Sequence, residues 1–88
     1  MILKGSLYRL IRLITSEQIR AARALLRISV VQLATLSEVG EATIKRIEAG
    51  NGLPSANIKT LNLITKAFEN AGIEFIGTPD DRPGVRLK

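Results

Sequence analysis

The stretch that decides the fold is residues 29–50, SVVQLATLSEVGEATIKRIEAG. Ser29 is followed three residues later by Gln32, which is the pattern of a capping box at the start of a helix. Residues 38–40 form a turn, and Gly50 takes the position after a second helix that glycine prefers. The stretch therefore predicts two short helices joined by a tight turn, with the second helix covering residues 41–49. We expect the buried positions to be Leu33, Ala34, Leu36, Val39, Ile44 and Ile47.

Two further helices flank this pair. Thr15 and Gln18 form another capping box, which predicts a helix running to about Arg27. Ser55 or Asn57 caps a last helix, which Gly72 ends. Apolar residues in both helices recur at intervals of three and four, so each helix buries one face. The predicted buried positions are Ile19, Ala22, Leu25, Leu26 and Ile28 in and after the first helix, and Ile58, Leu61, Ile64, Thr65 and Phe68 in the last.

The two ends of the chain differ from this central part. Residues 73–76 alternate in the manner of a β-strand, residues 77–84 read as a loop, and residues 85–87 can return as a partner strand. Residues 1–14 carry an apolar stripe at helical spacing, Leu7, Leu10, Ile11 and Ile14, which favours an extra packed helix or a poorly ordered leader over a membrane-surface or DNA-backbone arm. We therefore divide the chain into an apolar, basic extension (1–14), a helical domain (15–72) and a strand or hairpin tail (73–88).

Composition narrows the classes of function. The 88 residues include no cysteine and no histidine, which excludes disulfides and thiolate metal sites and removes the commonest general base and zinc ligand. We expect no metal, no cofactor and no catalysis. The net charge is +5 and the isoelectric point is about 10.3, a balance that favours polyanionic partners.

The sequence does not favour a membrane location. No apolar run reaches the roughly 18 residues that span a bilayer. Arginines interrupt the apolar N-terminal segment and no small-residue cleavage site follows it, so we do not interpret it as a signal peptide. We expect a cytoplasmic protein with no membrane partner.

The predicted helix at 41–49 has an exposed face suited to the DNA major groove. Arg46 can donate two hydrogen bonds to a guanine, and Ala42 or the methyl group of Thr43 can contact a thymine methyl. Glu41 can accept from a cytosine amino group or serve only as an acid at the helix start. Lys45 is better placed for a phosphate. A merely solvated face is the alternative for each of these side chains.

Three segments carry a family resemblance: IRAAR at 19–23, QLA at 32–34 and ATIKRIEAG at 42–50. At these spacings the chain resembles the Xre/Cro-type helix-turn-helix family, the phage-repressor-like DNA-binding domains of bacteria, over about residues 15–72. Its tail is similar to the ending of short, single-domain members. The resemblance implies an all-α fold, a repressor-like bundle of four to five short helices, here with a small C-terminal β-hairpin.

The resemblance also implies roles for single residues. It makes helix 41–49 the recognition helix and pairs Arg23 with Glu48 as a largely buried ion pair. By position, the base contacts fall at Glu41, Ala42 and Arg46, and the contacts near the DNA backbone fall at Ser29, Gln32 and Asn51.

The chain departs from the family pattern at four positions. Val30 replaces the usual phosphate-binding Gln, and Val31 beside it is also apolar. Glu38 takes a turn position usually held by Gly, where we expect left-handed or strained backbone, and Gly40 replaces the usual Ser or Thr cap. Val30 and Val31 could instead form an apolar patch for a partner.

The resemblance implies a sequence-specific DNA-binding transcriptional regulator that binds double-stranded DNA as a homodimer. The alternative is an interaction protein on the same fold, such as the DNA-binding or protein-binding half of a toxin–antitoxin-like pair.

Overall fold

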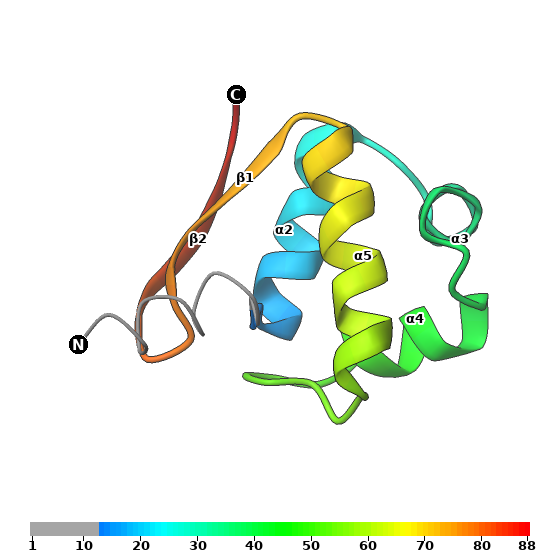
Figure 1. Cartoon of the computed structure of the whole chain (residues 1–88), viewed down its shortest axis with the longest axis horizontal. Coiled ribbons are helices and arrows are strands. Elements are labelled where there is room, and N and C mark those ends of the chain that lie inside the picture. The colour runs from blue at the N-terminus through cyan, green and yellow to red at the C-terminus, as the bar shows by residue number, and fades with distance from the viewer. Residues whose placement is uncertain (1–12) are drawn as a thin grey trace.

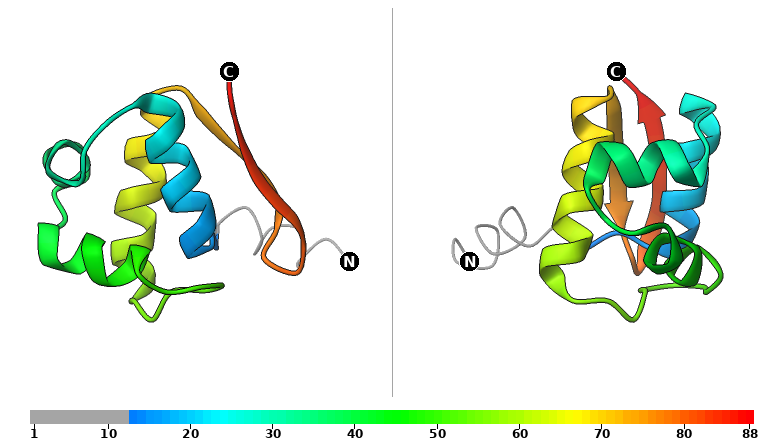
Figure 2. Two further views of the ribbon diagram at one scale, coloured as in Figure 1. Left: turned by 180° about the vertical axis from the view of Figure 1, so that it is seen from behind. Right: turned by 90° about the vertical axis from the view of Figure 1, so that its right-hand side faces the viewer.

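The computed structural model describes residues 13–88, which form four helices followed by a two-stranded antiparallel sheet (Figure 1). The sheet lies against the pair formed by α2 and α5, with β2 beside α2 and β1 beside α5 (Figure 2). The fold is therefore a mixture of helix and sheet, and the expectation of an all-α class is wrong. The elements are α2 (Ser16–Leu26), α3 (Val30–Ser37), α4 (Glu41–Glu48), α5 (Ile58–Asn70), β1 (Ile73–Thr78) and β2 (Asp81–Leu87).

Local capping chemistry starts the first two helices where the sequence predicts. The hydroxyl of Thr15 accepts from the backbone N–H of Gln18, and the Gln18 side chain accepts from the Thr15 N–H, which confirms the first capping box. Ser29 and Gln32 form the second box in the same way. Asn57 caps α5 by accepting from a backbone N–H one turn on. These bonds satisfy N–H groups that a helix start otherwise leaves without a partner.

The strands are longer than the sequence predicts. The predicted loop at 77–84 is wrong, because most of it belongs to the strands and the chain reverses within residues 79–80. Gly77 makes this possible: it adopts φ +74°, and a Cβ there would lie 2.2 Å from the carbonyl oxygen of Arg82. The register shifts at this glycine, as in a β-bulge.

Pro83 lies within β2 at the irregularity of the ladder, between the paired residues Asp81 and Gly84. Lys88 donates its backbone N–H to the carbonyl of Gly72, which sets the alternation of hydrogen-bonded pairs along the hairpin. By that alternation the backbone nitrogen of residue 83 faces the open edge, so no ladder bond is lost.

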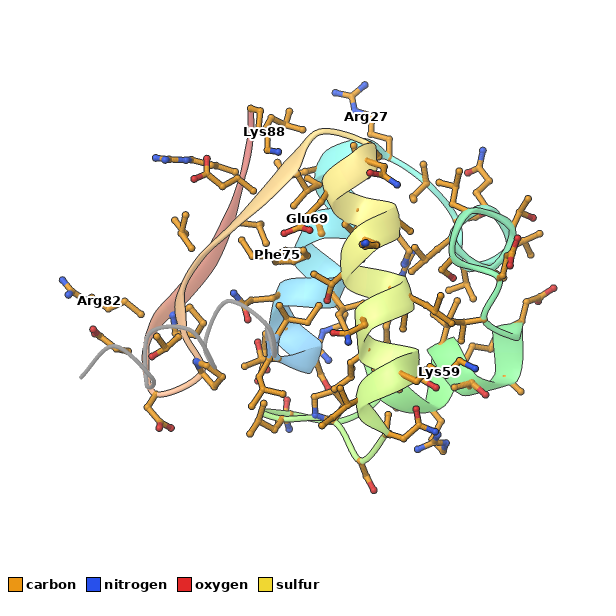
Figure 3. The ribbon with its side chains drawn as sticks, in the orientation of Figure 1. Arg27, Lys59, Glu69, Phe75, Arg82 and Lys88 are labelled. Carbon is orange, nitrogen blue, oxygen red and sulfur yellow. The ribbon has the colours of Figure 1, made fainter. Side chains whose placement is uncertain are left out.

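Gln18 fixes the hairpin to α2. Its side-chain amide donates to the carbonyls of Ile76 and Gly84, one on each strand. Phe75 points from β1 toward the helices (Figure 3) and packs edge-on against Phe68 of α5, with ring centroids 5.9 Å apart. The hairpin therefore covers one side of the core. This packing stabilises it, because an isolated two-stranded hairpin is only marginally stable in water.

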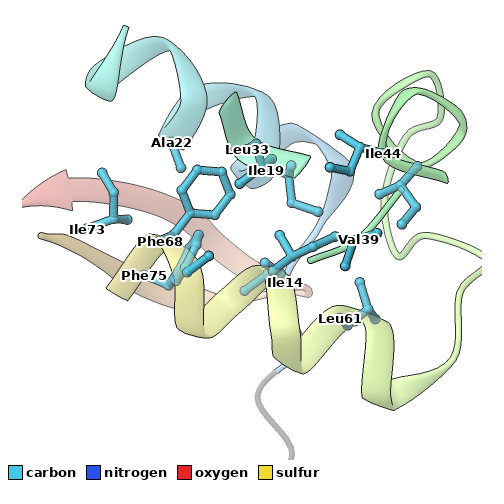
Figure 4. Close-up of a cluster of buried hydrophobic side chains, with 13 residues drawn as sticks. Ile14, Ile19, Ala22, Leu33, Val39, Ile44, Leu61, Phe68, Ile73 and Phe75 are labelled. Atoms are coloured by element: carbon cyan, nitrogen blue, oxygen red, sulfur yellow. The ribbon is translucent and has the colours of Figure 1, made fainter. Parts of the chain in front are cut away.

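One continuous core joins the helices and the hairpin (Figure 4). Most of the core lies at the predicted positions, including the turn residue Val39 and the α5 residues Ile64 and Phe68. Ile14, at the end of the predicted extension, is also buried there. The buried apolar residues are Ile14, Ile19, Ala22, Leu33, Val39, Ile44, Ile47, Leu61, Ile64, Ala67, Phe68, Ile73 and Phe75.

Three predicted core positions are wrong, namely Leu25, Leu36 and Ile58, which are 41%, 56% and 50% exposed. Leu36 lies off the buried stripe of α3 because the small side chain of Ser37, four residues after Leu33, takes the inward position. Leu25 lies beside the stripe of α2, and Ile58 is the first residue of α5, at the rim of the core.

Of the predicted N-terminal stripe, Leu7, Leu10 and Ile11 lie outside the described residues. Among residues 13–88, no helix is both long enough and apolar enough to cross a bilayer.

Candidate nucleic-acid interface

The helix predicted to read DNA presents one polar face and buries the other. Ile44 and Ile47 lie in the core, whereas Glu41, Ala42, Lys45 and Arg46 are exposed. Thr43 is half-buried at the margin. α3 and α4 lie at the same end of the molecule, away from the hairpin (Figure 1). The structure therefore brings the four predicted base-contact residues and Lys45 onto one short helix at an open end of the domain.

An ion pair holds the C-terminal end of this helix. Arg23 donates from Nε and Nη2 to the two carboxylate oxygens of Glu48, over 2.9 and 2.8 Å. The hydrogen bonds to Glu48 are the main cause that raises the pKa of Arg23 above its ordinary value. Arg23 also donates from Nη1 to the carbonyl of Ile28, in the connection to α3. The pair implied by the family resemblance is present, and it ties α2 to α4 and to the segment between α2 and α3.

Two further side chains of α2 bind the carbonyls at the end of α4. The hydroxyl of Ser16 donates to the carbonyl of Ile47 over 2.7 Å, and both groups are buried. Arg20 donates from Nη1 to the carbonyls of Glu48 and Gly50. A cation at a helix C-terminus is electrostatically favourable, because the free carbonyls there carry partial negative charge. These roles of Ser16 and Arg20 are not predicted by the sequence.

The loop after α4 is fastened to the start of α2. The backbone N–H of Ser16 donates to the carbonyl of Gly52 over 2.8 Å, and the Gly52 N–H donates to the carboxylate of Glu17 over 2.9 Å. The bond from Gly52 is the main cause that lowers the pKa of Glu17 below its ordinary value. Gly52 adopts φ +71°, a backbone conformation that glycine takes at little cost.

Arg46 is oriented by the same loop. Its Nη1 donates to the carbonyl of Ser55 over 2.7 Å. The bond spans the exposed side of α4 and joins the helix to the segment that precedes α5. Arg46 is thus an exposed cation with a defined orientation.

The residues predicted to lie near the DNA backbone occupy two places. Ser29 and Gln32 are exposed at the start of α3, where each already accepts a backbone N–H of the other. The capping bonds use only the oxygen atoms of these side chains as acceptors. The Ser29 hydroxyl hydrogen and the Gln32 amide N–H groups can therefore donate to an acceptor such as a phosphate oxygen. Asn51 is exposed in the loop after α4.

The turn between α3 and α4 has the strained geometry expected of its sequence. Glu38 adopts a left-handed conformation, with φ 61° and ψ 29°. Gly40 precedes α4 with extended backbone and supplies no side-chain cap. Val39 is buried between them. The turn between α3 and α4 therefore consists of one left-handed residue, one buried residue and one extended glycine.

Basic side chains of the described residues come from several different elements. Arg82 and Lys88 lie on the hairpin, whereas Lys59 lies on α5 near α4 (Figure 3). Three of the thirteen basic residues, Lys4, Arg9 and Arg12, precede the described range, whereas all eight acidic residues lie within it. The described residues therefore carry a net charge of +2 (ten basic less eight acidic), against +5 for the whole chain, so their long-range attraction to a polyanion is weak.

Metal chemistry finds no support in the described part of the chain, where no cluster of three or more His, Cys, Asp or Glu side chains can hold an ion. No family model matches the sequence, and no curated protein matches it either.

Proposed function

We propose that the protein is a sequence-specific double-stranded DNA-binding regulator of transcription, of the Xre/Cro helix-turn-helix type, with α4 as its recognition helix. One observation carries the proposal: α4 exposes Glu41, Ala42, Lys45 and Arg46 together while its C-terminal end is fastened to α2. A reading helix needs both properties, because base edges must be approached closely by side chains that are held in one place.

The proposed contacts divide into bases and backbone. Arg46 donates to a guanine, Ala42 and Thr43 contact a thymine methyl group, and Glu41 accepts from a cytosine. Lys45 binds a phosphate. Ser29, Gln32 and Asn51 also donate to the DNA backbone and set the orientation of the domain. The protein acts by occupying a promoter site or recruiting a partner there, without catalysis, metal or cofactor.

We further propose that it binds as a homodimer, because a single domain carries one recognition helix and a two-fold pair reads two half-sites about one helical turn apart. The open edge of β2 is the surface most suited to pairing: by the hairpin's alternation, the backbone N–H and carbonyl groups of Val85 and Leu87 face outward there. Leu87 is 53% exposed. Sedimentation equilibrium of the free protein and of its DNA complex tests this proposal, and a monomer in both contradicts it.

The DNA proposal is tested by capture of sheared genomic DNA with the purified protein, followed by sequencing. Arg46→Ala is the test variant, and Arg82→Ala is the matched control, because it removes the same charge from the distant hairpin (Figure 3). The wild type and the control should enrich one motif, which Arg46→Ala loses at one base position, with a binding loss of about 1–3 kcal/mol. Enrichment of no motif by the wild type would contradict the proposal.

A second candidate function is supported by the surface of α3. This helix contains no charged residue, and at its start Val31 is 54% exposed beside the half-buried Val30. An apolar surface of this kind fits a protein partner, as in the DNA-binding or protein-binding half of a toxin–antitoxin-like pair. Co-purification with the product of a neighbouring gene, lost in Val31→Asp and retained in Arg46→Ala, would favour this function.

A further inference from the structure

Arg46 has one hydrogen-bond partner among residues 13–88, and that partner is a backbone carbonyl. The bond runs from Nη1 to the carbonyl of Ser55, nine residues further along the chain. A guanidinium group is planar and carries five N–H donors in a fixed fork. Holding Nη1 therefore restrains the direction of the whole group. The edge formed by Nε and Nη2 remains free to donate a pair of parallel hydrogen bonds, the geometry that matches the O6 and N7 acceptors of guanine.

The carbonyl that holds Arg46 lies in a loop fixed at both ends. At its start, Gly52 exchanges hydrogen bonds with the backbone of Ser16 and the carboxylate of Glu17. At its end, Asn57 caps α5. Between them, Pro54 restricts the backbone and its carbonyl accepts from the N–H of residue 56 over 3.0 Å. The position of the Ser55 carbonyl is thus set by the start of α2 as well as by the loop.

We propose that the loop of residues 51–57 is a second determinant of base specificity, acting through the Ser55 carbonyl, which orients the Arg46 guanidinium so that its Nε/Nη2 edge reads a guanine. Glu17 and Pro54 are positioning residues in this arrangement, since neither needs to touch DNA. The inference rests on the proposed function and adds to it a mechanism by which the loop sets the preference of Arg46 for guanine.

The orientation of Arg46 is tested first in the protein without DNA. The Nε–H resonance of Arg46, assigned by its loss in Arg46→Lys, should show restricted motion in the wild type. It should become as mobile as the exposed Arg27 in Pro54→Gly, which frees the loop backbone, and in Glu17→Ala, which removes the acceptor for Gly52. Two loop variants are used so that the test survives if one of them fails to fold. A fully mobile Arg46 in the wild type would overturn the proposal, whatever the protein binds.

The base readout is tested by selection from a random double-stranded DNA library. Arg46→Lys should lose about 5- to 150-fold in preference for one guanine and keep the rest of the motif, because a lysine ammonium on a flexible stem has no planar fork that the Ser55 carbonyl can orient. Glu17→Ala and Pro54→Gly should lose part of the preference at that same guanine and nowhere else. Asp80→Ala is the matched control for Glu17→Ala, because it removes one exposed acid from the hairpin turn, and it should leave the motif unchanged.

The outcomes separate the two proposals. If the wild type selects a motif but the loop variants keep the full guanine preference, the positioning role of the loop is wrong and the DNA-binding function stands. If the wild type selects no motif while Arg46 is rigid, the DNA-binding function fails, and the base readout fails with it.

Discussion

Replacing Glu48 by alanine should destabilise the domain by leaving Arg23 without its partner. The carboxylate accepts two hydrogen bonds of 2.8 and 2.9 Å, and its side chain is 9% exposed. Removing one member of a buried ion pair costs about 3–5 kcal/mol. The Arg23 side chain is 28% exposed, so water can partly replace the lost bonds. We therefore expect a loss of about 2–3 kcal/mol in the free energy of unfolding, since the bonds of Arg23 to water recover the remainder.

The assay is thermal and urea unfolding of a double-mutant cycle. A loss of 2–3 kcal/mol corresponds to a fall in Tm of roughly 10–20 °C for a domain of this size. Glu48→Gln keeps the shape and one acceptor, so it should lose about half as much. Combining Glu48→Leu with Arg23→Met removes both charges, and this pair should be less destabilised than the sum of the single changes.

Two results would refute this reasoning. One is an unchanged Tm for Glu48→Ala. The other is additivity in the cycle to within about 0.5 kcal/mol, the limit found for sites that do not interact.

Three further predictions concern the turn at Glu38, the bulge at Gly77 and the hydrogen bond between Glu17 and Gly52. Glu38→Gly should stabilise the fold by about 0.5–1 kcal/mol, because relief of the left-handed strain exceeds the entropy cost of glycine; a lower midpoint in urea unfolding would contradict this. Gly77→Ala should cost about 2 kcal/mol or more, since its Cβ would meet the Arg82 carbonyl at 2.2 Å, and an unchanged Tm would show that the bulge is not constrained. Because folding lowers the pKa of Glu17, the stabilisation it gives is present above its unfolded pKa of about 4.3 and is lost as pH falls through the folded pKa. The stability difference between the wild type and Glu17→Gln should therefore shrink between neutral pH and pH 3, and a constant difference would exclude the Gly52 bond as its source.

The features that the sequence predicts correctly are local ones. A capping box such as Thr15–Gln18 needs only two residues at fixed spacing, and the structure contains both predicted boxes. The left-handed conformation of Glu38 is implied by the family resemblance, which places Glu38 at a turn position usually held by Gly, and the structure has it. These features depend on neighbouring residues, so their patterns survive in the sequence.

The errors come from choices that packing makes. Leu36 is more apolar than Ser37, yet Ser37 is the buried residue. Its hydroxyl donates a hydrogen bond to the carbonyl of Leu33, and its small side chain fits on the inward face of α3. The length of the hairpin strands differs from the prediction for a similar reason. The prolines and glycines of residues 77–84 suggest a loop, but the bulge at Gly77 and the open edge at Pro83 accommodate them within strands.

The missed parts of the site are contacts between side chains and backbone carbonyls. Ser16, Arg20 and Arg46 each bind a carbonyl distant in the sequence. Every residue has a backbone carbonyl, so such a contact does not require a particular type of residue as the acceptor. The sequence therefore contains no second residue that would reveal the contact. The Arg23–Glu48 pair needs two particular side chains, and for that reason the family resemblance could imply it.

The most direct test of α4 as a reading helix is an amide chemical-shift map of the protein, titrated with a duplex carrying the captured motif. We predict the largest changes at residues 41–49, with a second group at residues 29–32 and 51. The hairpin at 73–87 should change little if the free protein is already a dimer, and otherwise only along the outer edge of β2. The same titration with a scrambled duplex should give smaller changes over α4. Changes centred on the hairpin, or an equal response to both duplexes, would contradict recognition through α4.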